Sequence, residues 1–236
     1  MVRGPRQRSD QRRWLLALLA AAWLAPATAL AQAGPPADWG SVTTRIETDG
    51  TLGAAVDVSG VNSVYTVGED LGSRAGNNLF HSFRFFNLGQ GDTGLFTGSA
   101  SIENVVSRIT GGDPSYLNGT LESQIAGADF YFLNPSGVFF GPGASLDVPA
   151  AFYTSTAQSL GFDDGQDFAT EAGAGPVLSM ANPDSFGFFG TAPIRRIGVE
   201  GSTLAAAPSE ALALVGGDID LSGASVEASG GTLSLV

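Results

Sequence analysis

The chain has 236 residues, a formal net charge of −12 at neutral pH and no cysteine. This excess of negative charge repels polyphosphate and anionic membrane surfaces, so the composition argues against nucleic acid as a partner. Without disulfides the fold has to be held by an apolar core, which a domain of about 200 residues is large enough to form.

The first 31 residues have the organisation of a secretory signal peptide. A leader with five arginines is followed by a short apolar run, Trp14 to Ala25, and Pro26 ends that run. Ala29-Leu30-Ala31 is a small-x-small cleavage site, so we expect cleavage between Ala31 and Gln32. The apolar run is too short to span a bilayer, and no later segment is long and apolar enough to do so. The sequence therefore predicts an exported protein without a transmembrane segment.

The 205 residues that follow this cleavage site carry six arginines, no lysine and 22 acidic residues, a formal net charge of −16. Glycine accounts for 32 of them and separates short runs rich in Val, Ile, Phe and Thr. Residues 42–47 and 120–125 alternate between apolar and polar, whereas residues 128–133 and 138–140 are more continuously apolar. Many short strands with closely spaced turns, and no convincing helix, predict an all-β domain.

An internal repeat near the carboxyl end distinguishes between the all-β architectures. Residues Ala211 to Val215 recur 21 positions later as Thr232 to Val236, and short apolar runs around Leu221 and Val226 lie between them. A period of about 20 residues that holds three short strands is typical of one coil of a parallel β-helix. The final apolar strand has no capping segment after it, so we expect the chain to be the front of a longer protein.

Three stretches in a particular order carry a family resemblance: Gly76 to Phe86, which contains Leu-Phe-His-Ser-Phe, then Ile102 to Gly112, then Ala128 to Val148. Together they resemble the amino-terminal haemagglutination-activity, or two-partner-secretion, domain of the filamentous haemagglutinin family. The resemblance extends from about residue 42 to residue 159, and residues 211–217 are similar to the family's first β-helix coils. This chain has Asn-Pro-Ser-Gly at 134–137 where the family often has Asn-Pro-Asn-Gly, and it lacks the family's separate Asn-Pro-Asn-Leu motif.

The resemblance implies a fold, an organisation and a partner. The implied fold is a right-handed single-stranded parallel β-helix with amino-terminal capping strands and hairpins. Residues 1–31 would be the signal peptide, 32–190 the secretion domain and 191–236 the first β-helix coils. The implied function is secretion recognition for a large adhesin-type exoprotein, with no cofactor. POTRA domains of a dedicated outer-membrane barrel would recognise the chain in the periplasm, and the full exoprotein would meet a host-cell or surface receptor outside.

Six residues of these stretches are candidates for recognition by the transport partner: Asn78, His81, Phe83, Asn134, Pro135 and Gly137. Residues 134–137 also fit a type I turn, so a structural corner is an alternative that does not exclude recognition. The only histidine lacks a second histidine or a cysteine to share a metal or a catalytic triad. We interpret it as a partly buried imidazole bound to backbone, on the strand face that carries Phe83 and Phe85.

Other readings of the sequence are less well supported. The acidic residues of 163–167 lack the regular ligand spacing of a calcium loop and favour a solvated turn. The clustered phenylalanines are interpreted as core rather than as a carbohydrate platform. A polysaccharide-active enzyme on a parallel β-helix usually needs Lys or Arg against uronate carboxylates, and the arginines here are scattered. An autotransporter passenger is the other alternative, but no carboxyl-terminal barrel strands are present. We therefore predict a non-enzymatic protein.

Overall fold

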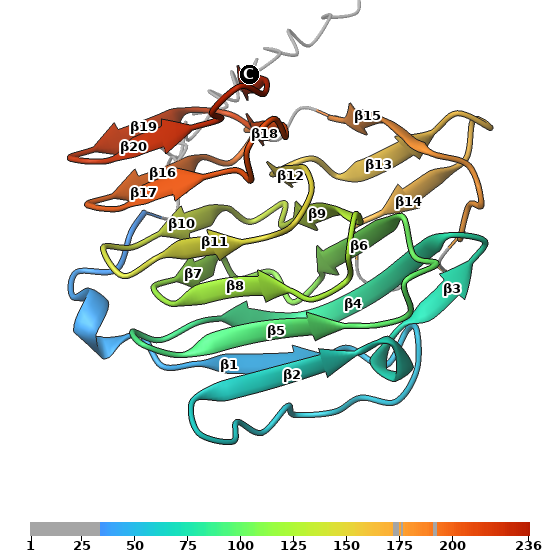
Figure 1. The fold of residues 1–236 in the computed structure, drawn as a ribbon, viewed down its shortest axis with the longest axis horizontal. Helices are drawn as coiled ribbons and strands as arrows, with labels where there is room; N and C mark the ends of the chain where they lie inside the picture. The colour runs from blue at the N-terminus through green and yellow to red at the C-terminus, as the bar shows by residue number, and fades with distance from the viewer. Residues whose placement is uncertain (1–33, 172–174, 176, 191–192) are drawn as a thin grey trace, which may run out of the picture. The chain divides into compact units, whose positions relative to one another are not determined.

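Residues 34–171, 175, 177–190 and 193–236 are described by a computed structural model (Figure 1). The chain divides into two units, Met1–Ala31 and Gln32–Val236, and only the second contains described residues. The predicted signal peptide and its cleavage site lie outside the described residues. The described part of the second unit is nearly all β, with short 3₁₀ helices at Trp39–Ser41 (η1) and Glu69–Leu71 (η2).

Most strands belong to coils that stack in parallel from the amino-terminal to the carboxyl-terminal end of this unit (Figure 1). The longest row of paired strands, which we call sheet A, takes one strand from each coil. Leu212 pairs with Leu233, so the 21-residue repeat in the sequence corresponds to one coil. In order, the parallel strands of sheet A are β4 (Asn78–Asn87), β6 (Asn104–Ile109), β9 (Asp129–Leu133), β12 (Phe152–Ser155), β18 (Leu212–Val215) and β21 (Leu233–Leu235).

Two further faces complete the coils, and the chain visits sheets A, C and B in turn. Sheet B contains β2 (Val64–Gly68), β5 (Thr93–Thr97), β8 (Thr120–Ser123) and β11 (Ser145–Asp147). Sheet C contains β7 (Ser115–Leu117), β10 (Val138–Phe140), β16 (Ile197–Glu200) and β19 (Ile219–Ser222). In the last coils, a separate parallel pair takes the place of sheet B: β17 (Thr203–Ala205) and β20 (Ser225–Glu227).

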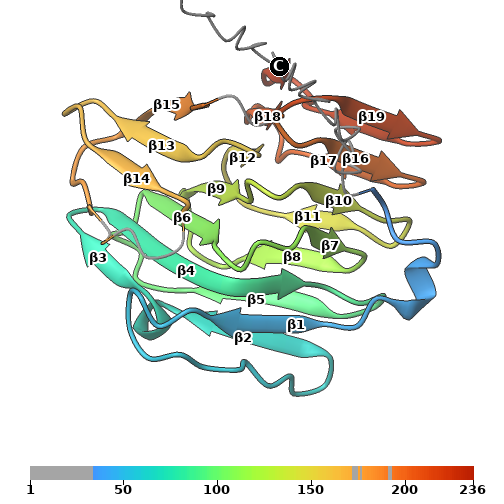
Figure 2. The same cartoon turned by 180° about the vertical axis from the view of Figure 1, so that it is seen from behind.

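Antiparallel strands are added to the coils at two places. At the amino-terminal end, β1 (Arg45–Thr48) and β3 (Ser73–Ala75) both pair with β4. Between β12 and β16 the chain leaves the coils and forms an antiparallel sheet, sheet D, from β13 (Ser159–Phe162), β14 (Asp167–Ala169) and β15 (Pro183–Gly187). Both views show sheet D beside the coils, on the side away from η1 (Figure 2). Residues 163–166 form the turn between β13 and β14, and Asp167 is the first residue of β14.

The core fills the inside of the coils because equivalent inward positions repeat from strand to strand. In sheet A, the side chains of one inward row are at most 1% exposed: Leu79, Val105, Phe130, Phe152 and Leu212. The rings of Phe130 and Phe152 are stacked with centroids 5.9 Å apart. Each large apolar side chain buried in this way contributes about 1.5–3 kcal/mol. The stability of the coils therefore accumulates from one coil to the next.

The predicted all-β fold, with parallel β-helix coils and amino-terminal capping strands, is confirmed, but one predicted core residue is wrong. Alternation placed Phe85 on the face of His81 and Phe83, whereas the structure buries Phe86 and leaves Phe85 partly exposed. The register between β1 and β4 shifts between Glu47 and Thr48, which moves the inward position by one residue. The ring of Phe85 instead lies against the guanidinium of Arg45, 3.6 Å from its carbon.

The guanidinium of Arg108 joins the coils, the amino-terminal segment and sheet D. Its side chain is buried at 1% exposure, and its carbon lies 4.5 Å from the centroid of the Phe168 ring. Nε donates a hydrogen bond to Oγ of Ser82 at 2.7 Å, and Nη2 donates to Oγ1 of Thr51 at 3.0 Å. Nη1 donates to the carbonyl oxygen of Ala169 in sheet D. One buried cation therefore holds three parts of the chain together.

Asp49 supplies the opposite charge through hydroxyl groups. Oδ2 accepts hydrogen bonds from Ser82 at 2.6 Å and from Thr110 at 2.7 Å, and Oδ1 accepts from the hydroxyl of Thr51 at 2.7 Å. Burial raises the pKa of the Asp49 carboxyl, but these hydrogen bonds outweigh burial and the net pKa lies below its ordinary value. Burial lowers the pKa of Arg108, and the charge of Asp49 opposes that shift. We call these five residues the Arg108 network.

Replacing the buried cation should destabilise the whole domain. We expect Arg108→Met to lower the free energy of unfolding by about 3 kcal/mol, because the hydroxyls of Ser82 and Thr51 lose their donor and Asp49 loses the opposite charge beside it. Urea unfolding of the chain measures this. The control is Arg84→Met, since that side chain is 61% exposed and its ion pair with Glu47 spans 3.5 Å. Arg84→Met should cost less than about 1 kcal/mol, and equal losses in the two variants would contradict the assignment.

Candidate functional site

Asn78, the first of the predicted recognition residues, is a buried structural amide at the start of β4. Its side chain is 1% exposed, and its Nδ2 donates to the carbonyl oxygens of Ser179 at 3.0 Å and Ala181 at 2.7 Å. Its Oδ1 accepts from Nδ2 of Asn104, the residue paired with it on β6, at 2.8 Å. Asn78 therefore fastens the segment that precedes β15 to the coils and starts a row of polar side chains across them.

His81 and Phe83 lie further along β4 and face the core. Both side chains are 0% exposed, and their rings are stacked with centroids 5.8 Å apart. Nε2 of His81 lies 3.1 Å from the carbonyl oxygen of Gly68, which is the backbone contact expected from the sequence, although the imidazole is completely rather than partly buried. Burial lowers the pKa of His81 to about 4, while the Gly68 carbonyl and Asp70 act in the opposite direction. The imidazole is therefore neutral at physiological pH.

Asn134, Pro135 and Gly137 form the corner between β9 and β10. The backbone N–H of Gly137 donates to the carbonyl oxygen of Asn134 at 3.1 Å, which closes a β-turn. The amide of Asn134, 0% exposed, donates to the carbonyl oxygen of Asp113 and to Oγ of Ser115, both at 3.0 Å. Gly137 has φ of +121°, in the left-handed region that favours glycine. The turn predicted from the sequence is therefore present.

The six candidate residues do not come together as one surface. Asn78, His81 and Phe83 lie on β4, whereas the corner of Asn134 follows β9, with β6 between the two strands in sheet A. Pro135 is partly buried and the other five are buried. The folded domain therefore keeps most of these side chains inside, where a partner cannot reach them.

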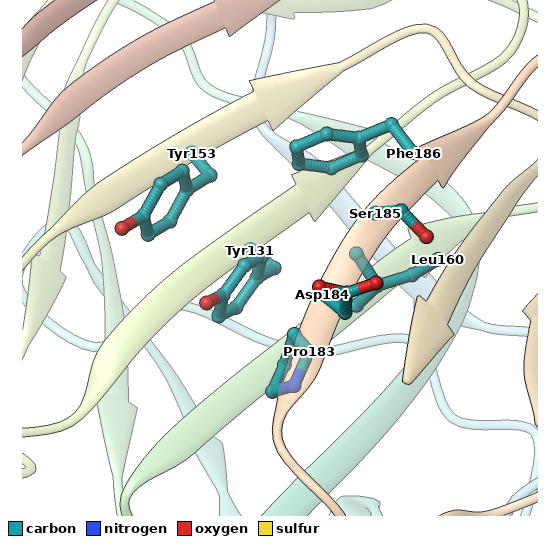
Figure 3. Close-up of a pocket in the computed structure, with 7 residues that line it drawn as sticks. All are labelled: Tyr131, Tyr153, Leu160, Pro183, Asp184, Ser185 and Phe186. Atoms are coloured by element: carbon teal, nitrogen blue, oxygen red, sulfur yellow. The ribbon is translucent and has the colours of Figure 1, made fainter. Parts of the chain in front are cut away.

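Two adjoining pockets lie on the outer face of sheet A beside sheet D, and together we call them the tyrosine groove. The smaller, of about 150 Å³, is lined by Tyr131, Tyr153, Leu160 and residues 183–186 (Figure 3). The larger, of about 440 Å³, shares Tyr131, Tyr153 and Pro183 and adds Glu103, Asn104, Gly127, Asp129 and Asn182. The rings of Tyr131 and Tyr153 are stacked at 4.6 Å with an interplanar angle of 8°.

Sequence reasoning missed the Arg108 network, the polar row that Asn78 starts and the tyrosine groove. One signal was available: Arg108 is a charged residue inside the run Val105 to Ile109, all of which is buried. A lone charge in such a run indicates a compensating network. The groove had no comparable signal, because its walls come from strands far apart in the sequence.

Among the described residues, no group of three or more His, Asp or Glu side chains could hold a metal ion.

Comparison with known protein families agrees with this architecture. A family model described as the TPS secretion domain matches residues 44–236, and the chain belongs to this family of two-partner-secretion domains. Membership assigns it a recognition role in two-partner secretion, with an outer-membrane transporter as partner and secretion across the outer membrane. No curated protein matches the chain. In the part that the structure describes, no helix is both long and apolar enough to cross a membrane.

The buried imidazole should make stability depend on pH. The unfolded chain takes up a proton on His81 below its ordinary pKa of 6.5, whereas the folded chain does so only near pH 4. Acidification therefore favours unfolding, and between pH 8 and pH 5 this residue should cost about 2 kcal/mol. The difference in unfolding free energy between the wild type and His81→Gln, measured by urea at several pH values, isolates this effect from the carboxylates. Parallel pH profiles for the two proteins would contradict it.

The corner should depend on the Asn134 amide. Asn134→Ala removes the hydrogen bonds to Asp113 and Ser115 and the one that Oδ1 accepts from the backbone N–H of Ser136 at 2.9 Å. We expect the unfolding free energy to fall by about 2 kcal/mol. Ser136→Ala changes the neighbouring side chain in the same turn and is the matched control, expected within about 0.5 kcal/mol of wild type. Thermal or urea unfolding tests this, and an unchanged Asn134→Ala would refute it.

Proposed function

We propose that this chain is the secretion-recognition domain of an adhesin-type exoprotein, and that POTRA domains of its outer-membrane transporter bind it before it folds. The observation that carries the proposal is the burial of the candidate residues. Asn78, His81, Phe83 and Asn134 are each at most 1% exposed in the folded domain. If the transporter reads these side chains, it reads them in an unfolded chain.

The architecture supports export in an unfolded form. The chain has no cysteine, so no disulfide loop would have to pass through a transporter. Most strand pairs in the coils join residues 21 or more positions apart, such as Leu212 with Leu233 and Asn78 with Asn104. Non-local pairing of this kind is intrinsically slow, which would keep the chain extended during transit. Each coil that forms outside buries apolar side chains on the preceding one and so opposes backward sliding.

The non-enzymatic part of the proposal is supported by the position of the only histidine. Both ring nitrogens of His81 lie in the core, with Nε2 at the Gly68 carbonyl, and neither is presented to a substrate. Other finer features remain part of the proposal: a signal peptide cleaved between Ala31 and Gln32, a domain boundary at residues 190 and 191, and a host-cell or surface receptor for the full exoprotein. These rest on the sequence patterns described above.

Binding and export, measured side by side, test the recognition role. The chain is diluted from urea onto immobilised POTRA domains and compared with chain that has been allowed to fold. We expect the freshly diluted chain to bind and the folded chain to bind at least about tenfold more weakly, because the recognised side chains are then covered. Alanine at Asn78, His81, Phe83, Asn134, Pro135 or Gly137 should weaken binding of the unfolded chain, with Ser136→Ala as the control.

Export through the cognate transporter separates recognition from folding. Normal POTRA binding with failed export would assign these residues to folding alone. A folded chain that binds as tightly as the unfolded one would contradict recognition before folding. If all six variants bind and are exported normally, the recognition signal lies elsewhere in the chain.

A further inference from the structure

The tyrosine groove combines hydroxyl groups with negative charge, and none of the described residues that line it is basic. Glu103 and Asp129 line the larger pocket, and Asp184 lines the smaller one. Burial raises the pKa of the Asp129 carboxyl, and the nearby charge of Glu210 adds to this effect. Carboxylates held in this way are stabilised by a cation. The electrostatics of the groove therefore favour a positively charged ligand.

Tyr131 presents a hydroxyl to the groove from a side chain that is otherwise largely buried. This side chain is 8% exposed, and no described residue forms a hydrogen bond with its hydroxyl. Figure 3 shows the hydroxyls of Tyr131 and Tyr153 pointing in the same direction, away from Phe186, and both residues line the larger pocket. Burial raises the pKa of the Tyr131 phenol, so the hydroxyl stays protonated and neutral. The hydroxyl therefore enters the groove as a neutral group that can both donate and accept a hydrogen bond.

The geometry of the two rings distinguishes between ligand classes. A sugar usually binds by stacking on an open aromatic face, but the facing sides of Tyr131 and Tyr153 cover each other at 4.6 Å. The other polar groups that line the groove are hydroxyls and carboxylates, which accept hydrogen bonds from a cation. The same protein already uses such groups around a guanidinium, since Arg108 lies on Phe168 and donates to two hydroxyls that bind Asp49. A planar guanidinium suits such oxygen acceptors better than a compact ammonium does.

We propose that the tyrosine groove binds an arginine side chain of a partner protein, which donates hydrogen bonds to the tyrosine hydroxyls and pairs with Asp129 and Glu103. The larger pocket, of about 440 Å³, is large enough for one such side chain. One wall of the groove comes from sheet A and the other from β15 and the residues before it. The groove therefore exists only in the folded domain, and this binding is independent of recognition of the unfolded chain.

A titration with a short peptide tests the proposal, with internal controls provided by the chain. The probe is the tripeptide acetyl-Gly-Arg-Gly-amide. The control peptide has neutral citrulline in place of arginine. The chain has four tyrosines, Tyr65, Tyr116, Tyr131 and Tyr153, so ¹³C labelling of tyrosine gives few NMR signals. We expect the arginine peptide to shift the signals of Tyr131 and Tyr153 and to leave those of Tyr65 and Tyr116 unchanged. Citrulline should have no effect, and added salt should weaken binding.

Substitutions in the groove should weaken this binding by about fivefold or more, since each removes a charged or hydroxyl partner. The variants are Tyr131→Phe, Asp129→Asn and Glu103→Gln, and Asp220→Asn on β19 is the matched control. Unchanged signals of Tyr65 and Tyr116 report that each variant is folded. The proposal is overturned if citrulline shifts the same signals equally, if all four tyrosines respond alike, or if maltose or spermidine shifts Tyr131 and Tyr153 while the arginine peptide does not.

Discussion

The buried guanidinium of Arg108 is the interaction on which the arrangement of the other parts depends. A cation at 1% exposure is tolerated only when its donors are satisfied and an opposite charge is near. Here those partners come from the segment before β2, from β4 and from sheet D. None of these segments can satisfy the charge alone, so sheet D and the segment that carries Thr51, between β1 and β2, have to dock on the coils together. The stacked apolar side chains inside the coils supply most of the stability, and the Arg108 network specifies which segments of the chain meet.

The two proposed interactions, recognition before folding and arginine binding after folding, would use different parts of one domain. The side-chain amides of Asn78 and Asn134 donate hydrogen bonds to backbone carbonyl oxygens inside the folded domain. A partner could therefore bind these amides only while the chain is extended. The tyrosine groove has the opposite requirement, because it forms only when sheet D lies against sheet A. One sequence can therefore carry two sets of contacts without conflict, since folding hides the first as it assembles the second.

The sequence predicted those features that repeat along the chain and missed those that combine distant segments. Glycine punctuation and alternation indicated strands, and the 21-residue repeat matches the pairing of Leu212 with Leu233. The corresponding separation from Phe152 to Leu212 is 60 residues, because sheet D is inserted there, and a periodic pattern contains no signal for such an insertion. Phe85 was misplaced for a related reason, since alternation assumes a regular strand and the register of β1 and β4 shifts.

The sequence is limited in the same way for the site residues. Their residue types indicated local structure such as a turn, but their positions in the sequence did not indicate which residues of other coils they contact. A glycine after Asn-Pro-Ser indicated a turn, and the hydrogen bond from Gly137 to Asn134 is local enough for that prediction to hold. Whether Asn134 also binds Asp113 and Ser115 depends on the coil before it, which local chemistry does not specify. Tyr131 and Tyr153 each look like an ordinary strand aromatic, and only the parallel register of β9 and β12 stacks them. In a parallel β-helix, surface sites are built across coils, so they become visible only once the register is known.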